Sequence, residues 1–413
     1  MGDKDLIGFS KIAATYEQLH PQEKLMEAPR HRETPITLGI PCETNSQEKR
    51  IALRPEAVSL LVNNGFDVRI ETGAGDPCKH LDREYSDQGA QITYSSEDIF
   101  KCEIVLKVSP PTFEEIELMK PNSTVISALN ITTISEEYLT ALNKKRITAI
   151  GYELVQDEDG GLPLVRAMSE IAGSTVMLVA AEYLSSNHKG KGIILGGVTG
   201  VPPTKVVIIG AGTVAEYAAR AAMGLGAEVK VFDNHIYKLS KLKERLNFHQ
   251  LYTSAIDSVM LQDALIRADV VIGALRSAEG GRSPIVVTEN MVAQMKPNSV
   301  IIDVSIDHGG CFETSHPTTH LKPTFRKFDV IHYCVPNIAS RVARTATTAI
   351  SNIFTPMLVE AADLGGIDKI IFAKNWFAKG VYAYKGSVTN EMIAKKTGMR
   401  YTNLELIIAT HIG

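Results

Sequence analysis

Residues 205–233 combine the residue types that bind a dinucleotide. A run of β-branched residues ends at Gly210, Gly212 follows two positions later, and an Ala-rich segment leads to a second apolar run that ends at Asp233. Gly210 permits a tight turn, and Gly212 allows the backbone to approach a pyrophosphate at the N-terminus of the following helix. Ala215 satisfies the requirement for a small third residue, where the helix packs closely on the strand.

Asp233 predicts which cofactor this segment binds. It follows the glycines by about 20 residues, where a carboxylate accepts hydrogen bonds from the adenosine ribose 2′-hydroxyl and repels a 2′-phosphate. A glycine turn alone is also found in ordinary βα scaffolds. Because strand, turn, helix, strand and acid all occur here in order, we predict that the segment binds NAD rather than NADP.

Length and composition limit the possible functions. The chain has 413 residues, which favours two domains, and its 44% hydrophobic and 22% charged residues are typical of a globular protein. The formal net charge of −4 gives no basic footprint for nucleic acid or an anionic membrane. Small polar molecules therefore remain the expected ligands.

The cysteines and the apolar segments indicate a cytoplasmic protein. The five cysteines are odd in number, widely separated and without a CxxC pair, which predicts reduced thiols and no metal site (Cys42, Cys78, Cys102, Cys311 and Cys334). The N-terminus has no secretory signal pattern. The longest apolar stretch, residues 171–184, contains Glu182 and is too short to span a bilayer.

The remaining chain alternates short β-type runs with helical segments, which predicts an α/β protein with doubly wound parallel sheets. The first set of strands is expected at 36–40, 68–71, 104–108, 124–128 and 147–152, with helices at 54–64 and 135–144. A long helix over 165–184 precedes the glycine turn. Further strands are expected at 270–275, 300–304 and 330–334, and another helix at 345–362.

This order predicts an inserted nucleotide domain. Residues 165–337 would form the NAD-binding Rossmann domain, and residues 36–164 and 338–413 together would form the substrate domain. Residues 1–35 are polar and predict a helical N-terminal extension. Leu275, which ends a strand of the nucleotide sheet, is expected to face the cofactor, because open α/β sheets bind ligands at the carboxyl ends of their strands.

Six collinear segments carry a resemblance to a known family: LGIPCETNSQEKRIALRP (38–55), IVLKVSPP (104–111), RAMSEIAG (166–173), LGGVTGVPPTKVVIIGAGTV (195–214), SVIIDVSIDHGGCFETSHPTTHLKPTF (299–325) and HYCVPNIASRVARTAT (332–347). Over residues 37–390 the chain resembles the alanine dehydrogenase and nicotinamide nucleotide transhydrogenase family, and alanine dehydrogenases most closely. The resemblance implies two Rossmann-like domains around a deep cleft, NAD as cofactor, a homo-oligomer, and interconversion of L-alanine with pyruvate and ammonia.

The resemblance also implies roles for individual residues. On the cofactor side these are Ser169 at a phosphate, Lys238 beside Asp233 at the adenosine ribose, and Asn337 at the nicotinamide. On the substrate side, Arg50 matches the arginine that binds the carboxylate, a task suited to its bidentate geometry. Asp307 matches the catalytic aspartate.

Two substrate positions depart from the family pattern. Ser109 stands where the family has its substrate lysine, which leaves Lys107 as the remaining lysine of that string, and Asn130 stands where the family has its catalytic histidine. Serine and asparagine can donate hydrogen bonds to a carbonyl, but neither transfers a proton near pH 7 as histidine does. We therefore expect slow alanine turnover.

Other polar residues have alternative interpretations. His308 either replaces the missing proton carrier or is solvated, and Lys107 either polarises the substrate or reaches solvent. His316 and His320 are four residues apart, but the intervening Pro317 favours a loop cluster over a zinc site. His332 is expected to pack in a buried strand, whereas Arg276 and Arg282 are expected to be surface charges.

Three functions fit these observations. The first is an NAD-dependent amino-acid dehydrogenase acting on L-alanine or on another amino acid. The second is an NAD(H)-binding sensor or interaction protein that has lost the chemistry. The third, the soluble NAD(H) domain of a transhydrogenase, is disfavoured because its Arg/Gln/Asp loop is absent from DEDGGLPLVRAMSE (157–170).

Overall fold

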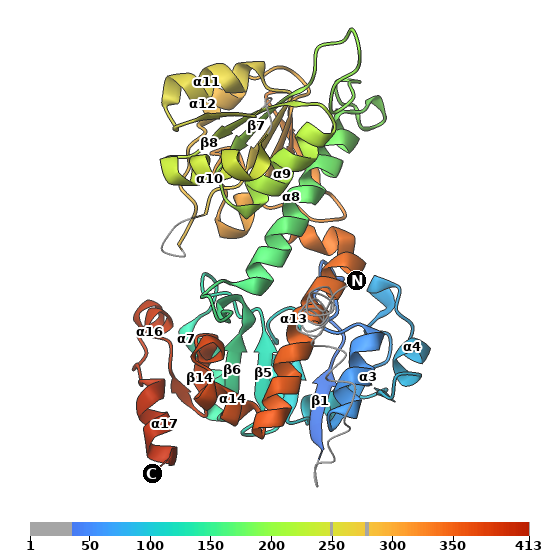
Figure 1. Cartoon of the computed structure of the whole chain (residues 1–413), viewed down its shortest axis with the longest axis vertical. Coiled ribbons are helices and arrows are strands. Elements are labelled where there is room, and N and C mark those ends of the chain that lie inside the picture. Colours follow the sequence, from blue (N-terminus) through green and yellow to red (C-terminus); the bar gives the residue numbers. More distant parts are fainter. Residues whose placement is uncertain (1–34, 248–250, 277–280, 413) are drawn as a thin grey trace, which may run out of the picture.

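Two sheets dominate the computed structural model, which describes residues 35–247, 251–276 and 281–412. Figure 1 shows the two sheets in separate halves of the molecule, with one long helix, α8, passing between them. The predicted helical extension over residues 1–35 lies outside the described residues apart from its last position.

The first sheet has eight strands in the order β15-β14-β6-β5-β4-β1-β2-β3. Its strands are β1 Ile36–Ile40, β2 Phe66–Glu71, β3 Gln91–Thr93, β4 Ile104–Leu106, β5 Thr124–Ser127, β6 Thr148–Gly151, β14 Val381–Tyr384 and β15 Ser387–Val388. The six strands from β1 to β6 are parallel, whereas β14 pairs antiparallel with both β6 and β15. The predicted parallel sheet is therefore present from β1 to β6, and two antiparallel strands from the end of the chain extend its edge.

The second sheet has seven strands in the order β12-β13-β11-β10-β7-β8-β9. Its strands are β7 Lys205–Ile209, β8 Glu228–Phe232, β9 Leu251–Ser254, β10 Val270–Gly273, β11 Val300–Asp303, β12 Thr324–Lys327 and β13 Val330–Tyr333. Only the edge strand β12 is antiparallel. The runs at 206–209 and 270–273 are thus buried parallel strands, and the run at 229–232 is a parallel strand whose Lys230 is only partly buried.

Helices cover both sheets. Around the first sheet they are α3 Pro55–Asn63, α4 Asp82–Ser86, α5 Ser96–Phe100, α6 Phe113–Leu118, α7 Glu136–Lys144, α13 Ala343–Leu364, α14 Ile367–Ala373, α15 Asn375–Ala378, α16 Glu391–Thr397 and α17 Leu404–Ile412. Around the second sheet they are α9 Thr213–Gly224, α10 Ile236–Leu246, α11 Ser258–Arg267 and α12 Glu289–Ala293, and α8 Pro163–Leu184 joins the two halves.

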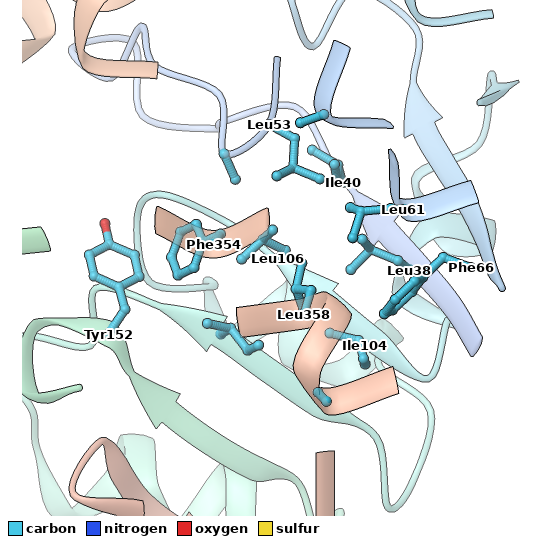
Figure 2. Close-up of a cluster of buried hydrophobic side chains, with 14 of the residues drawn as sticks. Leu38, Ile40, Leu53, Leu61, Phe66, Ile104, Leu106, Tyr152, Phe354 and Leu358 are labelled. Atoms are coloured by element: carbon cyan, nitrogen blue, oxygen red, sulfur yellow. The ribbon is translucent and has the colours of Figure 1, made fainter. Parts of the chain in front are cut away.

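Helix α13 closes one face of the first sheet although it follows the whole second sheet in sequence. Figure 2 shows Phe354 and Leu358 of this helix against Ile104 and Leu106 of β4. The ring of Phe354 also meets the ring of Tyr152 edge to face, with centroids 5.4 Å apart. Return of the chain to the first sheet through α13, β14 and β15 supports the proposed division into 36–164 with 338–413 and 165–337.

Helix α8 is long and apolar enough to cross a membrane, and is the one such helix among the described residues. Its apolar side chains have another explanation, because Val176, Val179 and Ala180 are buried in the core of the second half. Close packing against α9 is enforced at Gly173, where an added Cβ would overlap the backbone oxygen of Val214.

Candidate functional site

The glycine turn after β7 has the form required of a phosphate-binding loop. Gly210 has φ +112°, and an added Cβ would overlap the carbonyl oxygen of Ala274, so only glycine fits. A Cβ on Gly212 would meet no described heavy atom within 4 Å. Ala215 is fully buried behind the turn. The open space beside Gly212 at the start of α9 fits a pyrophosphate group.

Asp233 lies buried at the end of β8 and holds the same turn. One carboxylate oxygen accepts the backbone N–H of Ala211 at 2.8 Å, and the other accepts the N–H of His235 at 2.8 Å. A carboxylate has about four lone-pair sites, so further acceptor capacity remains for a ribose hydroxyl. The position, charge and neighbours of Asp233 therefore fit the adenosine side of an NAD site.

A cavity of about 330 Å³ lies between the two halves. Three of the predicted cofactor residues, Ser169, Leu275 and Asn337, line it, together with the predicted substrate residues Arg50, Asn130 and Asp307. Lys238 is exposed on α10 and is not part of this wall. Residues remote in sequence thus meet at one cavity, at the carboxyl ends of strands from both sheets.

Arg50 is held in this cavity by Glu48, a residue that the sequence reasoning missed. The Arg50 Nε and Nη2 atoms lie 2.7 and 2.6 Å from the two Glu48 oxygens, which makes a bidentate ion pair. Burial acts to raise the pKa of Glu48, but the hydrogen bonds and charge of Arg50 hold it below its usual value. The pair fixes the guanidinium and leaves its Nη1 group beside the Met168 sulfur at 3.2 Å.

Asn337 connects this ion pair to Asp307. Its side-chain amide donates to Glu48 at 2.7 Å, and its backbone N–H donates to Asp307 at 3.0 Å. Asn337 has φ +56°, a left-handed conformation that asparagine adopts more readily than most residues. Arg50 from the first half and Asp307 from the second are therefore joined through two intermediate residues.

Asp307 opens onto the cavity at the end of β11, within the 3₁₀ turn Val304–His308. The protein walls around it raise the pKa of Asp307 to about 6, against the opposing effects of the Asn337 N–H and the Arg50 charge. This carboxyl is therefore protonated below about pH 6, and above that pH it carries the negative charge that would pair with a cation.

Lys107 lies outside the cavity wall and does not reach solvent. Its ammonium lies 2.7 and 2.8 Å from the two oxygens of Glu115 and 3.9 Å from Glu43, and its side chain is 0% exposed. Ser109 is likewise absent from the cavity wall, and its backbone N–H donates to Glu43. The lysine of this segment is thus part of a buried ion-pair cluster.

Asn130 lines the cavity but its side-chain oxygen is already engaged. That oxygen accepts the N–H and the hydroxyl of Thr132 at 3.1 and 2.5 Å. The Asn130 backbone N–H donates to Glu153 at 2.7 Å, and the hydroxyl of Tyr382 donates to the same Glu153 oxygen at 2.5 Å. Glu153 lines the cavity too, which the sequence reasoning also missed.

Two basic residues of the second half reach the cavity. His308 is half-buried on its wall, and burial together with the charge of Arg276 lowers the pKa of His308. Arg276 also lines the cavity, and its side chain is exposed, as the prediction of a surface charge requires.

His316 and His332 take part in aromatic packing, and the cysteines form no disulfide. His316 stacks on Phe325 at 3.7 Å, and His332, buried as predicted, stacks on the other side and contacts Thr314. The described residues contain no group of three potential metal ligands that includes His316 and His320. All five cysteines are free, and four are buried.

A positional signal could have identified the missed residues. Glu153 follows β6 and Glu48 lies in the loop after β1, both at carboxyl ends of parallel strands, where ligands bind in open α/β sheets. The same rule selected Asp307. Glu48 also lies two positions before Arg50, a spacing that allows the observed pairing.

Comparisons with known proteins agree with this geometry. The model of the alanine dehydrogenase/PNT N-terminal domain matches residues 39–172, and that of the C-terminal domain matches residues 176–391. The chain belongs to the alanine dehydrogenase/PNT family. It is 38% identical to an alanine dehydrogenase of Mycolicibacterium smegmatis over 91% of this chain and 100% of that relative. It is also 38% identical to one of Bacillus subtilis, over 90% of this chain and 97% of that relative.

Solved structures of the alanine dehydrogenase/PNT family share the architecture. An L-alanine dehydrogenase superposes with a TM-score of 0.82 at 37% identity, covering 87% of this chain and 98% of that one. A transhydrogenase from Sinorhizobium meliloti superposes with a TM-score of 0.73 at 23% identity, covering 86% and 99%, which shows the shared fold. The predicted family and the two-domain Rossmann-like fold are thereby confirmed.

Proposed function

We propose that this protein is an NAD-dependent oxidoreductase of the alanine dehydrogenase type. It would interconvert an L-amino acid, with L-alanine as the first candidate, with its 2-oxo acid and ammonia. The observation that carries the proposal is the single cavity that joins Arg50 and Asp307 from different halves, beside the cofactor candidates Ser169, Leu275 and Asn337. Family membership and 37–39% identity to alanine dehydrogenases support the same reaction.

NAD fits the residues of the second half. Gly210 and Gly212 would hold the pyrophosphate, Ser169 a phosphate and Asp233 the adenosine ribose. Leu275 would face the cofactor, and Asn337 would lie at the nicotinamide. Exposed Lys238 would contribute at most at the ribose edge. When bound, NAD would supply the hydride acceptor for substrate oxidation.

The chain's own residues would bind and orient the substrate. Arg50, fixed by Glu48, presents the guanidinium that would bind the substrate carboxylate. Asp307, which is joined to the same network through Asn337, would hold the substrate amine or ammonia when ionised. Asn130 would contribute a hydrogen bond through its amide N–H₂, because its carbonyl oxygen is already used by Thr132.

A sensor with weak turnover is the second candidate. Two observations favour it: Lys107 is locked in an ion pair with Glu115, and neither Ser109 nor Lys107 brings a cation to the cavity wall. A dehydrogenase acting on another amino acid would also fit an altered substrate pocket. We further propose a cytoplasmic homo-oligomer that acts on small molecules without nucleic acid or membrane partners.

Turnover of a panel of amino acids and 2-oxo acids with NAD(H) tests the proposal. We expect NADH binding together with slow turnover of alanine and pyruvate. The double variant Ser109→Lys with Asn130→His should raise that turnover, and histidine tolerates the φ of +54° at position 130 better than most residues. NADH binding without turnover of any substrate would support the sensor instead, and a wild-type rate of about 10 per second or more would refute the role assigned to the two substitutions.

A further inference from the structure

Glu153 has an unusual environment for a carboxyl group. It lies directly after β6, lines the cavity, and accepts two hydrogen bonds through Oε1, from Asn130 and Tyr382. Its other oxygen, Oε2, is buried and has no hydrogen-bond partner among the described residues. A buried oxygen of an ionised carboxylate without a partner is costly, whereas a proton on that oxygen removes most of the cost.

No cation of the described residues forms an ion pair with Glu153 or lowers its pKa. The lysine of the nearby segment, Lys107, is committed to Glu115, and Ser109 carries no charge. Across the same cavity, the Arg50 guanidinium is paired with Glu48, and the charge of Arg276 acts on His308 in the second half. Burial raises the pKa of Glu153, although hydrogen bonds from the Tyr382 hydroxyl and from the backbone N–H groups of Glu153, Asn130 and Leu129 oppose it.

Glu153 is also the titratable group bonded to the altered position 130. Asn130 cannot carry a proton, yet its backbone N–H fixes the Glu153 carboxyl beside it. We propose that Glu153 is the proton donor and acceptor of this active site, in place of a side chain at position 130. This inference rests on the proposed amino-acid dehydrogenase function.

One carboxyl group, that of Glu153, can donate and remove each proton that amination requires. Protonated Glu153 donates to the oxygen of the 2-oxo acid as ammonia forms a bond to C2, which leaves a carbinolamine with a positively charged nitrogen. The Glu153 carboxylate removes one proton from that nitrogen. It then returns the proton to the hydroxyl group, which leaves as water while the nitrogen electron pair forms the C=N bond. One proton is consumed, and solvent replaces it on Glu153.

The first test compares Glu153→Gln and Tyr382→Phe with the wild type. Glutamine retains an oxygen for the Asn130 N–H but carries no exchangeable acid. We expect kcat for amination to fall by about a hundredfold or more, and the decline of rate at high pH to disappear. Tyr382→Phe removes a donor that stabilises the carboxylate, so the declining limb should move to higher pH at constant free ammonia.

Rescue separates a proton-transfer role from a structural one. The double variant Glu153→Gln with Asn130→His should turn over at least tenfold faster than Glu153→Gln alone, because the imidazole would supply the missing acid. Infrared spectra of the wild type should also contain the carbonyl band of a protonated carboxylic acid that Glu153→Gln lacks.

The outcomes distinguish this inference from the proposed function. Wild-type turnover with an unchanged pH profile in Glu153→Gln would overturn the inference and leave the function intact. A pH limb lost in His308→Gln but retained in Glu153→Gln would assign the proton to His308 and also overturn it. A wild type inactive across the substrate panel would overturn the proposed function and the proton-transfer step. In that case, absence of the infrared band would also disprove the protonated state of Glu153.

Discussion

Replacing Lys107 tests whether this lysine is structural or acts on substrate. Its ammonium contacts both oxygens of Glu115 at 2.7 and 2.8 Å, and the two side chains are 0% and 8% exposed. Lys107→Met would leave the Glu115 carboxylate buried without its cation. Removing one partner of a buried pair costs about 3–5 kcal/mol, so we expect a loss of that size in the free energy of unfolding.

The double variant Lys107→Met with Glu115→Gln should recover most of that loss. Replacing a buried pair by uncharged groups of similar size is often nearly neutral, because the desolvation penalty of both charges disappears. Glutamine also keeps an oxygen for the Thr112 N–H, which Glu115 accepts at 2.7 Å at the start of α6. Glu43 lies farther from the ammonium, at 3.9 Å, and can become protonated, since burial raises its pKa to about 7.

Thermal unfolding followed by circular dichroism measures these effects. For a domain of about 150–250 residues, 1 kcal/mol corresponds to about 2–4 °C, so the single variant should lose about 6–20 °C and the double variant much less. NADH binding and turnover of the double variant at 20 °C should match the wild type. A single variant with normal thermal stability and no turnover, and a double variant that stays inactive, would show that Lys107 acts on the substrate.

Three further predictions concern the cofactor and the carboxyl group of Asp307. NADH should bind at least tenfold tighter than NADPH, about 1.4 kcal/mol, and Asp233→Ala should narrow that gap in calorimetry; equal wild-type affinities would contradict the assignment. Gly210→Ala should weaken NADH binding in fluorescence titration by about a hundredfold or more, because its Cβ would overlap Ala274 at a φ that alanine avoids; unchanged binding would place the cofactor elsewhere. Since ionised Asp307 would hold the amine, kcat/KM for the amino acid should fall as pH drops below about 6. In Asp307→Asn this decrease at low pH should be absent. If the variant keeps the decrease, another group causes it.

The sequence by itself determined the elements that depend on local patterns. The alternation of short apolar runs with helical segments predicted the parallel strands of the second sheet, because parallel strands are joined by helical crossovers. The glycine turn and Asp233 could be recognised because their spacing within one βαβ unit is fixed by local geometry. Edge strands were missed: β14 and β15 are short, and their antiparallel pairing depends on a chain segment that returns from the other half.

The tertiary structure decided which candidate residues meet. Asn337 contacts Glu48 across 289 positions of sequence, and this contact joins Arg50 to Asp307; no local pattern encodes it. The ion pair of Lys107 is a second example, because α6 places Glu115 against its ammonium group. Glu153 became a candidate because Tyr382, 229 residues away, donates a hydrogen bond to one of its oxygens and the other oxygen is buried without a hydrogen-bond partner among the described residues. Burial and charge pairing set the chemistry of these groups, and both arise only when distant segments pack together.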